Sequence, residues 1–241
     1  HLGNPDVFDL LRNDLAVERP STADLERPRI AALVEDNIYR LFQIDDCAAC
    51  ALLVDHRTTI SVDTVISELK GCDNRWRHEY LKRLFNKDEV AGQDYHMQMV
   101  SLFAEYEPKG LLAFLKASER YPLEAALGVC QQRGLLEEQA YLLGRNGRVA
   151  EALTILLERM GDVRRAVLFA TEYQDPELWN LLVRYVLDHP HLLVSLLDHL
   201  EELGTLSEVG NDSGRPQPPP TAMPENVLRR LPPGTPVPRI A

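Results

Sequence analysis

Residues 147–170 read GRVAEALTILLERMGDVRRAVLFA and contain one short motif twice. The motif G-x-V-x-x-A-[LV] begins at Gly147 and again at Gly161, 14 residues later. In each copy the apolar side chains fall at i, i+3, i+4 and i+7, the spacing of one buried face of an α-helix. A glycine stands where each preceding helix is expected to end, because a left-handed residue commonly closes a helix. The stretch therefore predicts two short helices that pack as a pair.

The same period recurs on both sides of this stretch, at residues 123–130 and 178–185, and no long strand-like alternation competes with it. Helix starts are indicated by capping residues and by proline in the first turn, at Asn4-Pro5, Ser61, Asp162 and Asp175-Pro176. Helix ends are indicated by Gly134, Gly147, Gly161, Gly204 and Pro190. We therefore expect an all-α protein built of helices of about 10–14 residues.

A single apolar stripe does not stabilise so short a helix, because ordering the backbone costs more free energy than four or five buried side chains return. Additional apolar residues lie off the stripes, and we expect them to pack against a second neighbouring helix: Ile155, Leu157, Leu168, Phe169 and Val183. The short fixed period favours an α-solenoid of stacked short helix pairs over the alternative, a closed helical bundle.

The composition narrows the function classes. The 241 residues carry 37 acidic and 26 basic side chains, for a net charge of -11, which disfavours nucleic-acid binding. The longest apolar run, residues 48–54, is far shorter than the roughly 20 residues of a membrane span. Four cysteines are too few for a disulfide scaffold, and no signal-peptide pattern opens the chain. We therefore expect a cytoplasmic protein that associates with membranes only peripherally. Because the sequence begins at His1, we also expect it to be a fragment or a processed product.

Proline divides the chain, since 9 of its 16 prolines lie in the last 38 residues. We predict an α-solenoid over residues 1–203, a proline-rich flexible insertion over 204–222, and the next, truncated solenoid helix over 223–241. The helix of the last segment is expected at residues 224–231. The alternative to a flexible insertion is that the P-x-x-P sequence within residues 216–220 is a ligand for a domain that binds proline-rich segments.

The pattern that most resembles a metal-binding or redox motif is Cys47-x-x-Cys50. Together with Cys72 and His78 it forms a possible zinc set, which would make a zinc- or thiol-dependent regulatory domain. The other interpretation is structural, because the run DDCAACALLVD (residues 45–55) predicts a packed helix capped by Asp45 or Asp46. We favour the second interpretation and expect no metal and no cofactor.

Two features are candidates for contact with a partner. The first is a basic run in an acidic chain, made of Arg75, Arg77, Lys82, Arg83 and Lys87. It suits an acidic partner or an anionic headgroup, but Arg75–Glu79 and Glu79–Arg83 pairs at i, i+4 favour an ordinary solvated helix face. The second is Trp179, which is either a partner anchor or, as we favour, a wedge between helices.

No catalytic motif is present. The sequence has no nucleophile elbow, no phosphate-binding glycine loop and no H-E-x-x-H motif, and its histidines lack catalytic companions in sequence. We therefore expect neither an enzyme nor a small-molecule substrate.

Three short motifs within residues 121–190 carry a family resemblance: CQQRG from Cys130, YLL-x-R-x-G from Tyr141 and DPELW from Asp175. Their order, together with YLKRLFN from Tyr80 and YHMQMVSLFAEYEPKGLLAFLK from Tyr95, resembles the clathrin-heavy-chain-repeat region of the vacuolar protein sorting-associated protein 41 family. The resemblance is specific from residue 74 to 190, looser before residue 71 and absent across the proline-rich insertion.

Members of that family are subunits of the HOPS membrane-tethering complex. The resemblance implies a clathrin-heavy-chain-type α-solenoid acting at late endosome, lysosome or vacuole membranes in trafficking and fusion. Its implied partners are the other HOPS subunits and, through the complex, Rab-family GTPases and adaptor-coated carriers. The nearest alternative is a scaffold subunit of a clathrin-like coat or of another vacuolar sorting complex.

Overall fold

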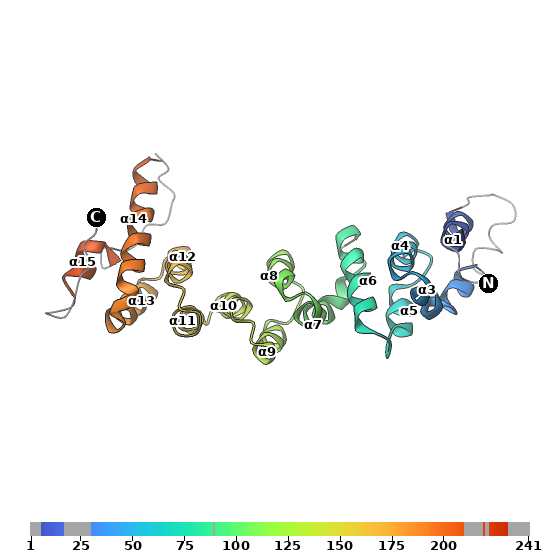
Figure 1. The fold of residues 1–241 in the computed structure, drawn as a ribbon, viewed down its shortest axis with the longest axis horizontal. Helices are drawn as coiled ribbons and strands as arrows, with labels where there is room; N and C mark the ends of the chain where they lie inside the picture. The colour runs from blue at the N-terminus through green and yellow to red at the C-terminus, as the bar shows by residue number, and fades with distance from the viewer. Residues whose placement is uncertain (1–5, 17–29, 89, 210–218, 220–221, 231–241) are drawn as a thin grey trace. The chain divides into compact units, whose positions relative to one another are not determined.

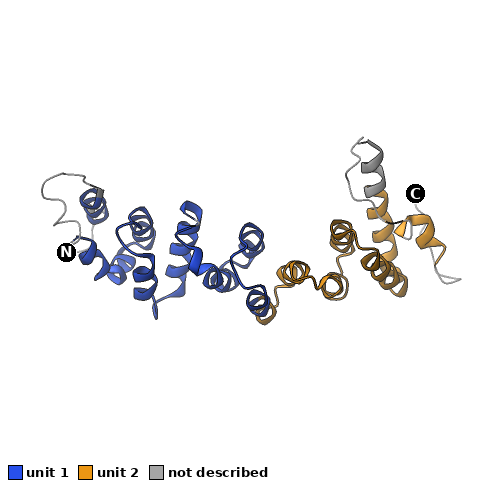
Figure 2. Ribbon diagram, turned by 180° about the vertical axis from the view of Figure 1, so that it is seen from behind, with its two compact units in different colours: residues 1–129 blue, residues 130–241 orange. Residues whose placement is uncertain are grey.

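The computed structural model describes the chain except residues 1–5, 17–29, 89, 210–218, 220–221 and 231–241. All regular structure in the described residues is helical, as predicted. The chain forms two compact units, His1–Val129 and Cys130–Ala241 (Figure 2).

Unit 1 is a succession of short helices, drawn blue to green in Figure 1. They are α1 (Asp6–Ala16), a helical stretch at 30–35, α3 (Ile38–Ile44), α4 (Asp46–Asp55), α5 (Val62–Glu68), α6 (Asn74–Lys87), the 3-10 turn Gln93–Tyr95, α7 (His96–Tyr106) and α8 (Pro108–Ala117). The helix α6 packs against α4 on one side and α7 on the other, and α7 packs in turn against α8.

Unit 2 continues the same construction from the last four residues of α9, which spans Leu123–Arg133. Its further helices are α10 (Leu136–Arg145), α11 (Val149–Thr154) with a π-helical turn at Ile155–Arg159, α12 (Val163–Tyr173), α13 (Pro176–Asp188), the 3-10 turn Pro190–Leu192, α14 (Leu193–Val209) and α15 (Pro224–Leu228). Consecutive helices pack on one another from α10 to α15, and two pairs of helices that are two places apart also meet, α11 with α13 and α12 with α14. This pattern is that of an α-solenoid.

The predicted helix starts are confirmed wherever they fall in described residues. The side chains of Ser61, Asp162 and Asp175 each accept a hydrogen bond from a backbone N–H of the first turn, at 2.9–3.2 Å. Asp45 caps α4 in the same way, accepting from the Ala48 N–H at 2.8 Å. Such caps stabilise helices too short to hold themselves. The predicted start at Asn4-Pro5 lies outside the described residues.

Three of the four predicted glycine stops are confirmed. Gly134, Gly147 and Gly161 have φ of 69°, 77° and 64°, the left-handed conformation that glycine adopts without strain. After Gly147, the Arg148 N–H donates back to the Leu143 carbonyl at 2.9 Å and closes the end of α10. The fourth prediction is wrong, because α14 continues through Gly204 to Val209. Glycine is tolerated inside a helix at a modest cost in stability, so Gly204 does not by itself end α14.

Two helix boundaries near the end of the chain differ from the predicted ones. The solenoid helix runs six residues past the expected limit of 203, and most of the expected insertion, including the P-x-x-P sequence apart from Pro219, lies outside the described residues. A helix is present in the last segment, but α15 covers Pro224–Leu228 rather than 224–231. It packs against α14 and buries Val227 completely, so the helices continue after the proline-rich stretch.

The predicted apolar stripes form the core. Ala152, Ala166 and Ala170 are 0% exposed, and their small side chains let neighbouring helix axes approach. Of the off-stripe residues, Leu157 and Val183 are buried as expected, whereas Leu168 is 53% exposed. The expectation that Leu168 packs on a second neighbour is therefore wrong, because the outer face of α12 faces solvent at this position.

Replacing a core leucine of unit 2 should cost far more stability than replacing the exposed one. We expect Leu153→Ala, at a position that is 0% exposed, to lower the free energy of unfolding by about 2–5 kcal/mol, because the substitution leaves a cavity between α11 and its neighbours. The matched control Leu168→Ala should change it by less than about 0.5 kcal/mol. Urea unfolding followed by circular dichroism measures both, and equal losses would contradict the assignment of the core.

Candidate functional site

The candidate contact surface is the charged face of α6, in unit 1. Asp73 caps this helix by accepting from the Arg75 N–H at 2.9 Å. Its apolar face, with Tyr80, Leu81 and Leu84 each 0% exposed, turns toward the neighbouring helices. The charged side chains therefore emerge along the two edges of α6, beside α4 and α8.

Arg83 connects α6 to α4. Its Nε donates to Glu79 Oε1 at 2.8 Å, which confirms the predicted i, i+4 pair. Its two Nη atoms donate to the carbonyl oxygen and the Sγ of Cys47, both at 2.8 Å. The Glu79 carboxylate, followed by Cys47, raises the pKa of Arg83 above its ordinary value. One planar guanidinium thus holds two helices at once, which suits arginine better than lysine.

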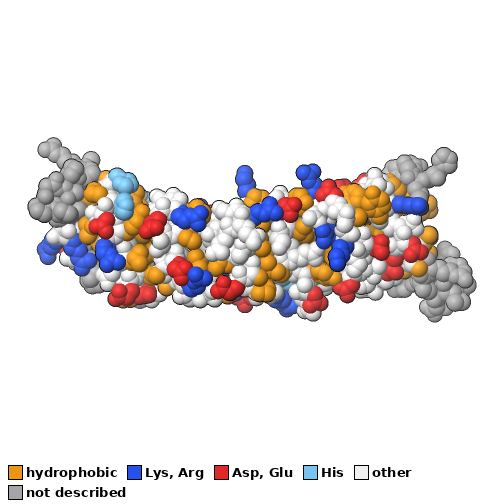
Figure 3. All heavy atoms as spheres, turned by 90° about the horizontal axis from the view of Figure 1, so that it is seen from below, with side chains coloured by type: hydrophobic (Ala, Val, Ile, Leu, Met, Phe, Trp, Pro, Cys, Tyr) orange, Lys and Arg blue, Asp and Glu red, His pale blue; other side chains and the backbone are white. Residues whose placement is uncertain are grey.

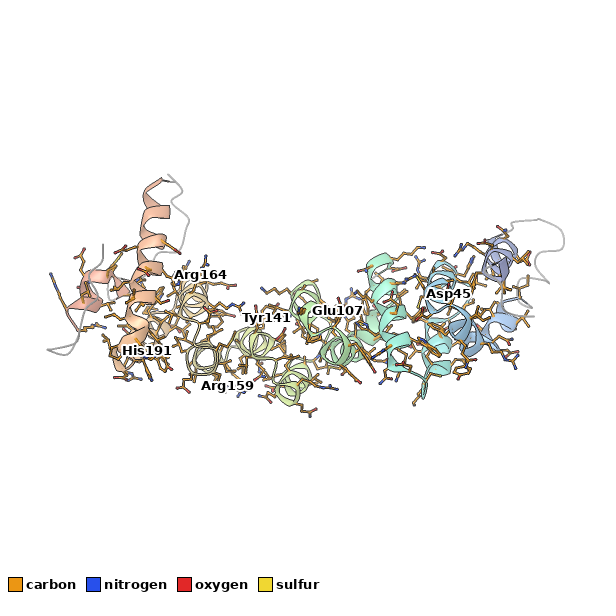
Figure 4. The ribbon with its side chains drawn as sticks, in the orientation of Figure 1. Asp45, Glu107, Tyr141, Arg159, Arg164 and His191 are labelled. Carbon is orange, nitrogen blue, oxygen red and sulfur yellow. The ribbon has the colours of Figure 1, made fainter. Side chains whose placement is uncertain are left out.

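Lys82 connects α6 to the start of α8. Its Nζ lies 2.6 Å from Glu107 Oε2, and Glu107 is the residue between α7 and α8 (labelled in Figure 4). The Nε2 of the buried His78 lies 3.8 Å from the same carboxylate oxygen. Lys87 forms an ion pair with Asp55, at the end of α4. Three of the predicted contact residues therefore link α6 to other helices.

Of the remaining two basic residues, Arg75 contacts α7 and Arg77 contacts its own helix. The Arg75 guanidinium lies 6.0 Å from the centre of the Tyr106 ring, and Arg77 donates to Asn74 in the first turn of α6. Charges of both signs are interspersed on the face shown in Figure 3. The structure thus brings the five residues onto one helix, and it shows which side chains of the same chain each of them contacts.

Trp179, the other predicted contact residue, lies inside unit 2. It follows the Asp175 cap in the first turn of α13 and is 1% exposed. Burial of so large a ring among helices matches the structural interpretation, and it leaves almost no surface of Trp179 for a partner.

The cysteines do not assemble into the alternative zinc set. Cys50 is buried and Cys47 is exposed on the same helix, while the Cys72 thiol donates to the Glu68 carbonyl at 3.6 Å. Burial raises the pKa of the Cys50 thiol to about 12 and so favours its neutral form. Within the described ranges, no three Cys, His, Asp or Glu side chains lie close enough together to hold a metal ion. The helical interpretation of residues 45–55 is confirmed by α4 and its Asp45 cap.

Sequence reasoning missed two hollows beside α6. The first, of about 520 Å³, is lined mainly by charged side chains, among them Asp46, Arg75, Glu79 and Arg83. The second, of about 380 Å³, lies between α6, α7 and α8 and is lined by aromatic rings and small residues. The sequence feature that could have indicated the second hollow is a row of small residues along one face of α8, namely Gly110, Ala113 and Ala117. Among the described residues, no helix is long and apolar enough to cross a membrane.

Comparison with known proteins gives one consistent family. A family model described as the Vps41 TPR-like region matches residues 24–206. The vacuolar protein sorting-associated protein 41 homolog of Solanum lycopersicum is 34% identical over 220 residues, covering 88% of this chain and 22% of that protein. The Homo sapiens and Mus musculus homologs are each 38% identical over 176 residues, covering 73% of the chain and 20% of those proteins. None of the solved structures matches the chain.

The three-way contact of Arg83 should be sensitive to a conservative change. We expect Arg83→Lys to lower the free energy of unfolding by about 1–2 kcal/mol, because one ammonium group cannot reach both Glu79 and Cys47. Urea unfolding checks this, with Arg164→Lys on the exposed side of α12 as the control. If the two variants unfold at the same urea concentration, Arg83 does not join α4 to α6.

His78 should make unit 1 less stable in mild acid. Burial lowers the pKa of His78 below its ordinary 6.5, against the opposing effect of Glu107. The unfolded chain therefore takes up this proton first as the pH falls, and stability is lost between about pH 6.5 and the lower pKa of the folded state. The pKa of His56 is lowered by burial as well, so a part of the effect belongs to it.

The test compares urea unfolding at about pH 7.5 and about pH 5.5. The wild-type chain should lose more stability on acidification than His78→Gln does, while exposed His191→Gln serves as the control substitution. An equal loss in the wild type and in His78→Gln would show that the buried imidazole is not responsible.

Proposed function

The chain belongs to the Vps41 family, and we propose that it is a scaffold and protein-contact segment of a HOPS membrane-tethering subunit acting in endosome- and lysosome-to-vacuole trafficking and fusion. The observation that carries the proposal is the family match over residues 24–206, which covers the helices of both units from the stretch at 30–35 to α14. The chain spans about a fifth of the length of the curated relatives it matches, so it corresponds to one segment of such a subunit.

The mechanism we propose is geometric. Within each unit, consecutive helices are fixed to their neighbours by buried side chains, and in unit 1 also by the Arg83, Lys82 and Lys87 contacts between helices. Such a segment holds the modules attached to it at a set separation and presents long lateral faces to partners. It needs no catalysis, no cofactor and no small-molecule substrate.

The proposed partners are the other HOPS subunits, with Rab-family GTPases and adaptor-coated carriers engaged through the complex. The proposed location is the cytoplasmic face of late endosome, lysosome or vacuole membranes, with peripheral membrane association only. The family named by the comparisons favours this proposal over a clathrin-like coat or another vacuolar sorting scaffold.

The proposal is tested by a pull-down of the 241-residue chain with each other HOPS subunit and candidate adaptor, beside the full-length protein. We expect the chain alone to retain at least one HOPS subunit. If the full-length protein binds and the chain binds nothing, the segment is a spacer without a contact function. Binding of clathrin-coat components in place of HOPS subunits would favour the alternative.

A charge-reversal pair decides whether the α6 face takes part in that binding. The double variant Lys82→Glu/Arg83→Glu should weaken subunit retention about tenfold if this face is the contact, because it reverses the charge of two half-buried cations. Arg159→Glu/Arg164→Glu makes the same change of charge at exposed positions in unit 2 and is the matched control. Circular dichroism of both variants separates loss of binding from loss of fold. Unchanged retention would remove α6 from the interface.

A further inference from the structure

We draw no further inference here: the strongest candidate, the hollow of about 590 Å³ between α11, α13 and Arg230 in unit 2, is lined by acidic and basic side chains in equal number, so its charge selects no partner, and nothing in the part of the chain that the structure describes shows what covers it.

Discussion

Short helices that cannot stand alone are the constraint on which this structure depends. Most helices here are close to the three turns of an average globular helix, and some, such as α11 at Val149–Thr154, are shorter. These helices are therefore stabilised by burial against neighbouring helices, which in unit 2 include the helix two places along for α11 with α13 and α12 with α14. The alanines at 152, 166 and 170 permit that contact because they keep the axes close. The proposed scaffold role rests on this neighbour-by-neighbour construction.

In unit 1, hydrogen bonds and ion pairs of basic side chains also join neighbouring helices. Arg83, Lys82 and Lys87 emerge from one helix and reach Cys47, Glu107 and Asp55 on its neighbours. An acidic chain with a basic run suggests an electrostatic contact surface, yet the run serves first to join helices.

The sequence predicted the helices well because their signals are local. A period of 3.6 residues, the Asp162 cap and Gly161 lie within a few residues of what they specify. Local predictions were wrong at Gly204 and Leu168, because the tertiary neighbours decide whether a helix continues and which outer face is covered, and α15 is shorter than predicted. The sequence indicated the cations of the candidate contact surface but not the residues that they contact. Their partners lie 25–36 residues away, and the hollow between α6, α7 and α8 needs three helices, which no local pattern reveals.

The central claim is that each helix is held by its nearest neighbours, and hydrogen exchange measured by mass spectrometry on a Trp179→Ala variant tests it most directly. The side chain of Trp179 is 1% exposed within α13. The account predicts faster exchange in α13 and in the helices packed on it, α11, α12 and α14, with α4, α6 and α7 unchanged. Faster exchange across the whole chain, or confined to α13 alone, would contradict it.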